Sequence, residues 1–75
     1  MRFYFHQYLN GKLTRNHEGR DFENEQSARV YAFSQAASLL SGAMDGTNNA
    51  YVAVEVTDHG KTNFVVRGNI NLDEK

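Results

Sequence analysis

The sequence predicts an α+β fold: a two-layer sandwich of order ββαββ, with one four-stranded, mainly antiparallel sheet and a single helix packed on one face. Three observations predict it. An aromatic run precedes an Asn-Gly pair, an Ala-rich segment has helical periodicity, and a Val-rich alternating segment precedes a glycine turn. The chain of 75 residues is expected to form one domain, residues 1–75, because a second core would not fit this length. Residues 69–75 are polar, end in three charges and are expected to form a frayed tail.

The first strand is expected at residues 2–9, where aromatic residues, which favour strands, follow one another closely. Asn10-Gly11 comes next, and this pair tolerates the positive φ angles of a type I′ hairpin turn. A second, weaker strand is therefore expected within residues 12–22, with a bend at residues 16–19.

The helix is expected within residues 22–44, with Asn24 as its N-cap, because the Asn side chain can accept a hydrogen bond from a free backbone N–H. Turning each residue by about 100° groups the apolar side chains on one broad arc. That arc consists of Ala32, Phe33, Ala36, Ala37, Leu39, Leu40, Ala43 and Met44. Serines dominate the opposite face, so one side packs on the sheet. The helix ends at Gly42 or, as we expect, at Gly46, because the arc continues past Gly42.

A second hairpin closes the fold. Residues 51–57 alternate between valine and other side chains, which indicates a strand with one buried face. Residues 58–60, Asp-His-Gly, supply the turn, since glycine takes the left-handed position of such loops readily. The return strand is expected over residues 62–67, with Phe64 and either Val66 or Val65 facing inward.

One helix can cover only one face of the sheet. We expect Val52, Val54 and Val56 under it, with Phe3 and Phe5 as their partners. The uncovered face then carries a histidine and three tyrosines: Tyr4, His6, Tyr8 and Tyr51. In the opposite register of the first strand, Phe3 and Phe5 are the exposed rings instead. Either register leaves aromatic side chains uncovered.

The composition argues against several classes of protein. The chain has no cysteine, which excludes disulfides and favours a reducing, cytoplasmic environment. No basic stretch followed by an apolar run opens the sequence, so no secretory signal is expected. No membrane span is expected either, because the longest apolar runs are far short of the ~20 residues that a span needs. Eight basic residues stand against nine acidic ones. Dedicated nucleic-acid binders normally carry a basic excess, so nucleic acid is not the expected partner.

The order of these features resembles a known family. An aromatic run ending in His, a glycine turn, an acidic bend, a helix opening near Ala-Arg and a Val-rich hairpin follow one another. The matching residues are Phe3, Tyr4, Phe5, His6, Gly11, Glu18, Gly19, Ala28, Arg29, Val54, Val56, Asp58 and Gly60. Together they resemble a family of small bacterial domains of unknown function, frequent in proteobacteria of the rhizobial kind. The resemblance implies a shared fold and no catalytic residues, since the family has no assigned reaction.

The chain departs from this family at a few positions. Asn16-His17 replaces a more acidic bend, Glu23 stands where a proline often precedes the helix, and Gln7 replaces an aliphatic residue. A looser likeness, in element order alone, is to small antitoxins with an aromatic strand and an Ala-Leu helix.

His6 is the first candidate for chemistry, because histidine is the commonest general base and a frequent metal ligand. No nucleophile or carboxylate lies near it in sequence, so we expect a half-buried histidine hydrogen-bonded to a neighbour. Glu55 could share its face, but the sequence leaves the strand order open. His6, His17 and His59 lack metal-ligand spacing. We therefore expect no metal, no cofactor and no enzymatic activity.

Arg29 falls within the apolar arc of the projected helix. A guanidinium is rarely buried without a partner, so we expect its stem to pack at the sheet edge. Its head would then reach Asp21, Glu18 or a carboxylate on a strand. The functional alternative is an anion anchor.

These features favour a small, non-enzymatic interaction module that self-associates, or docks a protein partner, through the helix-free aromatic face. Exposed aromatic patches mark protein interfaces, where tyrosine is enriched. A sheet edge could serve instead, by strand addition. The alternative is a weak nucleic-acid-binding or antitoxin-like regulatory domain, since tyrosines on an open sheet can stack on bases.

Overall fold

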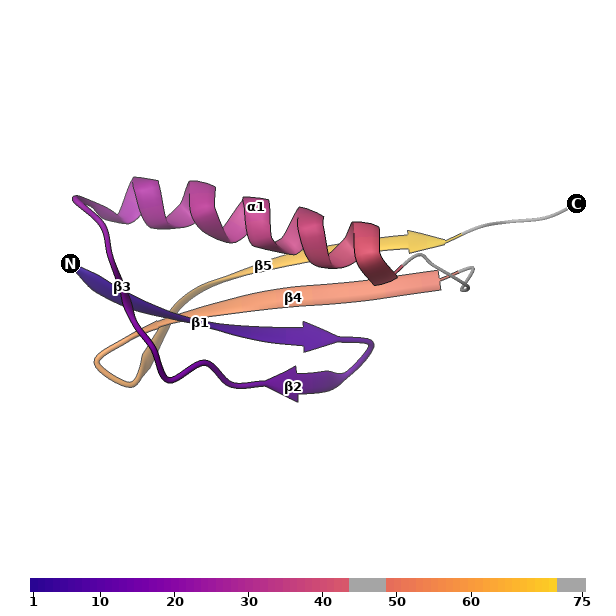
Figure 1. Ribbon diagram of the computed structural model, residues 1–75, viewed down its shortest axis with the longest axis horizontal. Coiled ribbons are helices and arrows are strands. Elements are labelled where there is room, and N and C mark those ends of the chain that lie inside the picture. Colours follow the sequence, from indigo (N-terminus) through magenta and orange to yellow (C-terminus); the bar gives the residue numbers. More distant parts are fainter. Residues whose placement is uncertain (44–48, 72–75) are drawn as a thin grey trace, which may run out of the picture.

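The computed structural model describes residues 1–43 and 49–71. One helix lies across one face of a sheet, which gives two layers (Figure 1). The elements, in chain order, are β1 (Arg2–Leu9), β2 (Lys12–Thr14), β3 (Arg20–Asp21), α1 (Glu25–Ala43), β4 (Asn49–Asp58) and β5 (Lys61–Asn71). The predicted α+β class is confirmed.

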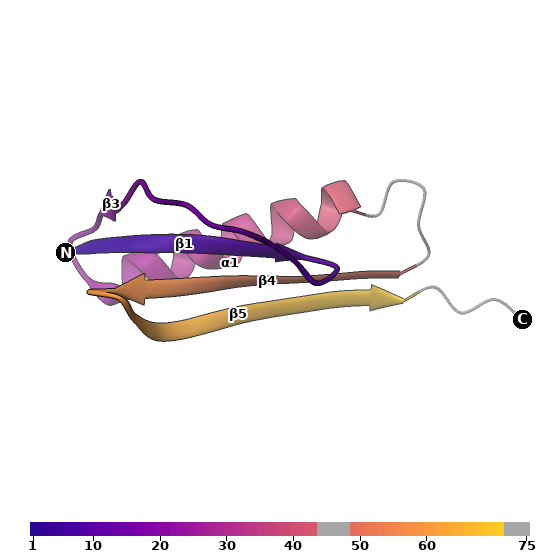
Figure 2. The same ribbon diagram turned by 90° about the horizontal axis from the view of Figure 1, so that it is seen from below.

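The sheet has five strands rather than the predicted four, in the order β2-β1-β4-β5, with β3 also paired to β1. All neighbouring strands are antiparallel. The weak strand expected within residues 12–22 is split in two. Its first part pairs with the end of β1, through Gln7 and Thr14, and its second part pairs with the beginning of β1, through Phe3 and Arg20. Between them the chain leaves the sheet edge (Figure 2).

Both hairpin turns use two residues with positive φ. The angles are 50° and 87° at Asn10 and Gly11, and 51° and 77° at His59 and Gly60. This conformation matches the type I′ turn, whose twist suits antiparallel strands. The prediction for the Asn-Gly pair is confirmed. The second hairpin also contains a register shift, which lies between Val56 and Thr57.

The core lies between the helix and the inner face of β1 and β4. Its large side chains, Phe3, Phe5, Val52, Val54 and Val56, are almost fully buried. Phe5 makes an edge contact with Tyr31 of the helix at 4.9 Å between ring centroids. The register expected for β1, with its phenylalanines inward, is therefore confirmed.

The helix begins as predicted, because the Asn24 side chain accepts a hydrogen bond from the Ser27 N–H at 2.9 Å. The helix turns a different face toward the sheet than the projection of the sequence at about 100° per residue predicts. A line of small residues at every fourth position, Ala28, Ala32 and Ala36, is buried, while Phe33 is 66% exposed. The small side chains let the helix axis approach the Phe and Val layer closely. Met44 and Gly46 lie outside the described residues.

Strand β5 is longer than the return strand expected at residues 62–67. It extends to Asn71, and its last three residues pair with the start of β4, as in the pair Tyr51 and Asn69. The ladder with β4 therefore continues through residues 69–71, which we expected to belong to the frayed tail. Residues 72–75 lie outside the described part of the chain.

Candidate interaction surface on the helix-free face

The four predicted surface residues all come from the side of the sheet that faces away from the helix. Period two in β1 turns Tyr4, His6 and Tyr8 away from the core, and Tyr51 follows the same rule in β4. In the ladder, His6 pairs with Glu55. The sheet therefore gathers these side chains on one face as predicted, but they differ in how far they are exposed.

His6 is buried, with only 8% of its surface exposed. Its Nδ1 accepts a hydrogen bond from the backbone N–H of Asn16, and its Nε2 lies 3.2 Å from the hydroxyl oxygen of Thr57. An Nδ1 that accepts leaves the proton on Nε2, which then donates to Thr57. The expectation that no part of the chain covers this face is wrong at His6, because residues 15–19 cross over it.

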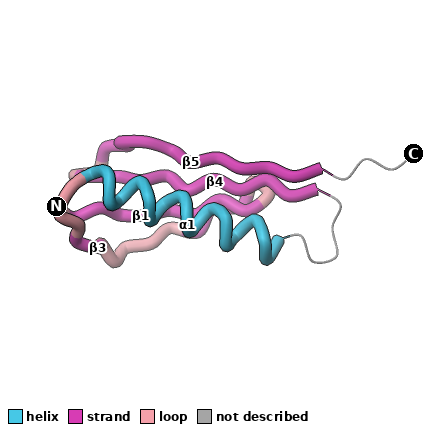
Figure 3. Tube along the Cα trace, turned by 90° about the horizontal axis from the view of Figure 1, so that it is seen from above, coloured by secondary structure: helices cyan, strands magenta, loops and turns pink. Residues whose placement is uncertain are grey.

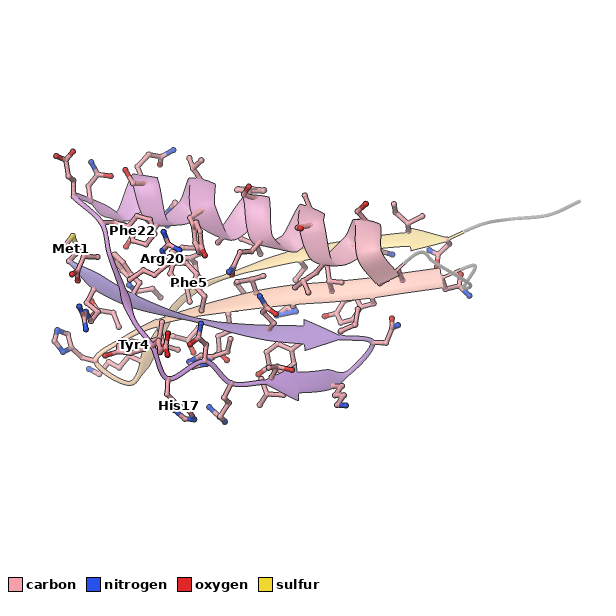
Figure 4. All side chains as sticks on the ribbon, viewed as in Figure 1. Met1, Tyr4, Phe5, His17, Arg20 and Phe22 are labelled. Atoms are coloured by element: carbon pink, nitrogen blue, oxygen red, sulfur yellow. The ribbon has the colours of Figure 1, made fainter. Side chains whose placement is uncertain are left out.

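The same crossing segment half-buries Tyr4, beneath Gly19. A Cβ atom at Gly19 would lie 2.6 Å from the Arg2 side chain and 3.1 Å from the Tyr4 ring. Only glycine therefore allows the segment to lie this close. The Arg2 guanidinium is held beside it by Asp21, at 3.0 Å. Figure 4 places Tyr4 beside this segment, on the side of β1 away from the helix.

The other end of the face is open. A shallow hollow of about 310 Å³ is lined by residues of β1, β4 and β5. These residues, which we call the open end, are Tyr8, Tyr51, Ala53, Glu55, Val65 and Arg67. Tyr51 is 42% exposed and Val65 36%. Of these residues, Tyr8 and Tyr51 were predicted to lie on the helix-free face, and the strand register adds the other four. The register also places Val66, not Val65, on the inner face of the sheet.

Glu55 is the carboxylate of the open end, and hydroxyl groups hold both of its oxygens. Tyr8 donates to Oε1 at 3.2 Å, and the Thr62 hydroxyl donates to Oε2. The bond from Thr62, aided by Tyr8, lowers the pKa of Glu55 against the opposing effect of burial. Burial and the neighbouring carboxylate raise the pKa of Tyr8. Across the hollow, Arg67 Nη1 donates to the Tyr51 hydroxyl at 3.5 Å.

Arg29 lies on the helix and does not reach the partners expected for it. Its Nη2 donates to Glu25 Oε2 at 2.9 Å, one helical turn away, while Asp21 pairs with Arg2. The guanidinium itself lies 4.7 Å from the ring centroid of Phe64 in β5. Both contacts engage the guanidinium, while the Arg29 side chain stays 47% exposed, and the anion-anchor alternative stays a prediction.

The remaining histidines lie at the surface. His17 and His59 are exposed, and His59 lies 3.4 Å from the carboxylate of Asp58. Within residues 1–43 and 49–71, no three His, Cys, Asp or Glu side chains gather closely enough to hold a metal ion. In the same residues, no helix has the length and apolar character needed to cross a bilayer.

Comparison with protein families gives a match over most of the chain. The model of a domain of unknown function, DUF6894, matches residues 2–66, which include the residues that carry the resemblance described above. The comparisons with curated proteins and with solved structures found no match.

Proposed function

This chain belongs to the DUF6894 family of domains of unknown function, and we propose that it is a small interaction module whose copies associate through the open end of the helix-free face. The observation that carries the proposal is the hollow itself, where two tyrosines, an alanine and a valine meet on three strands without a covering helix. Tyrosine is enriched at interfaces because its ring is apolar and its hydroxyl can stay hydrated.

The charges of the open end favour a second copy as the partner. The hollow contains one carboxylate, Glu55, and one guanidinium, Arg67. A surface with one charge of each sign can meet its own copy about a two-fold axis so that opposite charges face each other. The aromatic rings would then stack at the centre of the interface, and the charged groups would set its register.

A non-enzymatic role agrees with the chemistry of the face. Glu55 is engaged by Tyr8 and Thr62 through both oxygens, and His6 is buried and bonded through both ring nitrogens. Neither group is free to act as a general base on a substrate. We keep the cytoplasm as the proposed location, on the strength of the cysteine-free composition.

One observation favours a second candidate, the binding of single-stranded nucleic acid. Arg67 lies beside Tyr51, and proteins that bind single strands combine a stacking ring with a nearby cation. This alternative predicts retention on single-stranded RNA at low salt, which Arg67→Gln would abolish. The near-neutral balance of charges makes it the weaker proposal, because phosphate neutralisation supplies most non-specific affinity.

Sedimentation equilibrium of the wild-type chain and two variants tests self-association. Tyr51→Ser removes an exposed ring from the open end, and Phe33→Ser removes an exposed ring from the outer side of the helix. We expect Tyr51→Ser to weaken association by at least about tenfold, or roughly 1.4 kcal/mol, and Phe33→Ser to leave it unchanged. A wild type that stays monomeric at high micromolar concentration, or equal effects of both variants, would refute the proposal.

A further inference from the structure

The two edges of the sheet are built differently. On one side, β2 and β3 have only three and two residues, and residues 15–19 run between them. On the other side, β5 has eleven residues and forms the outer strand of the sheet (Figures 2 and 3). Natural proteins blunt sheet edges with short strands, prolines or covering segments, because a long free edge is a template for another strand. The β5 edge has no proline, and within the described residues no strand covers it.

The hydrogen bonds of Tyr51 identify the free backbone groups of β5. The Tyr51 N–H and C=O both bond to Asn10, on the β1 side of β4. Its ladder partner Asn69 therefore has no backbone bonds with it, and the N–H and C=O of Asn69 point out of the sheet. Hydrogen-bonded and non-hydrogen-bonded pairs alternate along the ladder, so the backbone N–H and C=O of Arg67 and Val65 also point out of the sheet.

We propose that β5 pairs antiparallel with β5 of a second copy, about a two-fold axis at Val66. This register pairs the regular part of β5 with itself, from Phe64 opposite Gly68 inward, and Asn69 lies next to that part, opposite Asn63 at the register shift. Val65 of each copy faces Arg67 of the other, and each of these pairs exchanges two hydrogen bonds through the outward groups. An axis at Arg67 would place like charges directly opposite, which destabilises antiparallel pairs.

The side chains on the helix side fit the same register. Phe64 is half-buried and has the Arg29 guanidinium over its ring. In the proposed pair it faces Gly68 of the second copy, across a non-hydrogen-bonded pair in which side chains lie closest. A phenylalanine opposite a glycine covers the backbone that the glycine leaves bare. The strand is therefore complementary to itself, which favours a second copy over an unrelated peptide.

This pairing uses the edge of the sheet and does not depend on association through the open end. A two-fold axis perpendicular to the sheet would place both helices on one side and both open ends on the other. The two aromatic hollows would then lie on one continuous surface.

Disulfide trapping tests the register directly, because the chain has no cysteine of its own. In the proposed dimer the two Val66 Cα atoms lie about 4.5 Å apart, within the range that a disulfide spans. The matched control is Ile70→Cys, on the same strand and the same face. Its two copies would lie eight residues apart along the strands, about 27 Å. With oxidised glutathione, we expect Val66→Cys to form the covalent dimer at least about tenfold faster than Ile70→Cys.

Proline at the free edge gives the second test. Asn69→Pro removes an N–H that points out of the sheet, so the fold loses no internal hydrogen bond, while Asn69→Ala keeps that N–H. We expect Asn69→Pro to lower the mass measured by sedimentation and Asn69→Ala to leave it unchanged, with the same circular dichroism for both.

The two tests overturn the β5 pairing if the cysteine variants cross-link equally and Asn69→Pro does not alter the mass. A mass that falls with Tyr51→Ser but not with Asn69→Pro would support the open end alone. The reverse result would support the edge alone.

Discussion

Replacing His6 with leucine tests whether this histidine holds the crossing segment on the sheet. Leucine has a similar volume, so the change removes two hydrogen bonds without a large cavity. The lost bonds join His6 to the Asn16 N–H and to the Thr57 hydroxyl, each at 3.2 Å. A typical hydrogen bond contributes about 1 kcal/mol. Asn16 is exposed and Thr57 is half-buried, so water can replace part of each bond, and the expected loss is about 1–2 kcal/mol.

Urea unfolding followed by circular dichroism measures this loss. With an m-value of about 1 kcal/mol per molar urea, usual for a small domain, the midpoint should fall by about 1–2 M. Amide hydrogen exchange gives the local readout: the Asn16 amide should lose protection in His6→Leu. The matched control is Thr57→Val, which removes only the bond to Nε2 and should leave Asn16 protected. An unchanged exchange rate at Asn16 in His6→Leu would refute the role assigned to His6.

Three further predictions concern the stability at acidic pH, the packing of the helix and the first turn. The hydrogen bond from Thr62 lowers the pKa of Glu55 from its ordinary value of 4.5. The ionised Glu55 therefore stabilises the folded state above pH 4.5, and this stabilisation is lost as the pH falls through the lowered pKa. Thr62→Val should therefore flatten the acid side of a plot of melting temperature against pH, and an unchanged slope there would contradict this. Ala32→Leu should destabilise by about 1–3 kcal/mol by overpacking the helix against the sheet, whereas the exposed Ala37→Leu should change stability by less than about 0.5 kcal/mol. Equal urea midpoints for these two variants would contradict the observed rotation of the helix. Gly11→Ala should cost about 1–2 kcal/mol, because φ is 87° there, and a thermal melt equal to wild type would contradict the turn assignment.

Local chemistry was sufficient to predict most of the strands. The Asn-Gly pair fixed the first turn because few other residues accept two positive φ angles in succession. The alternating valines of β4 fixed its inner face, because a shift by one residue would expose all of them. Tyr8 and Tyr51 followed from the same period, so the tyrosines of the open end were predictable, while Val65 and Arg67 required the ladder with β4.

The rotation of the helix and the cover over His6 could not be predicted in this way. Hydrophobicity alone favours burial of Phe33, yet the helix buries the smaller side chains of Ala28, Ala32 and Ala36. The phenylalanines and valines of the sheet already fill most of the space under the helix, and this determines which helix face can pack there. The burial of His6 depends on Asn16, ten residues away, and no sequence period links the two.

The long strands also make the molecule elongated. Its axes measure 48, 21 and 16 Å, and its Cα radius of gyration is 13.4 Å, whereas a compact chain of 75 residues would have about 11 Å. An elongated particle meets more friction than a sphere of equal mass. A lone chain should therefore elute early from a sizing column, at a position that mimics a larger, rounder protein.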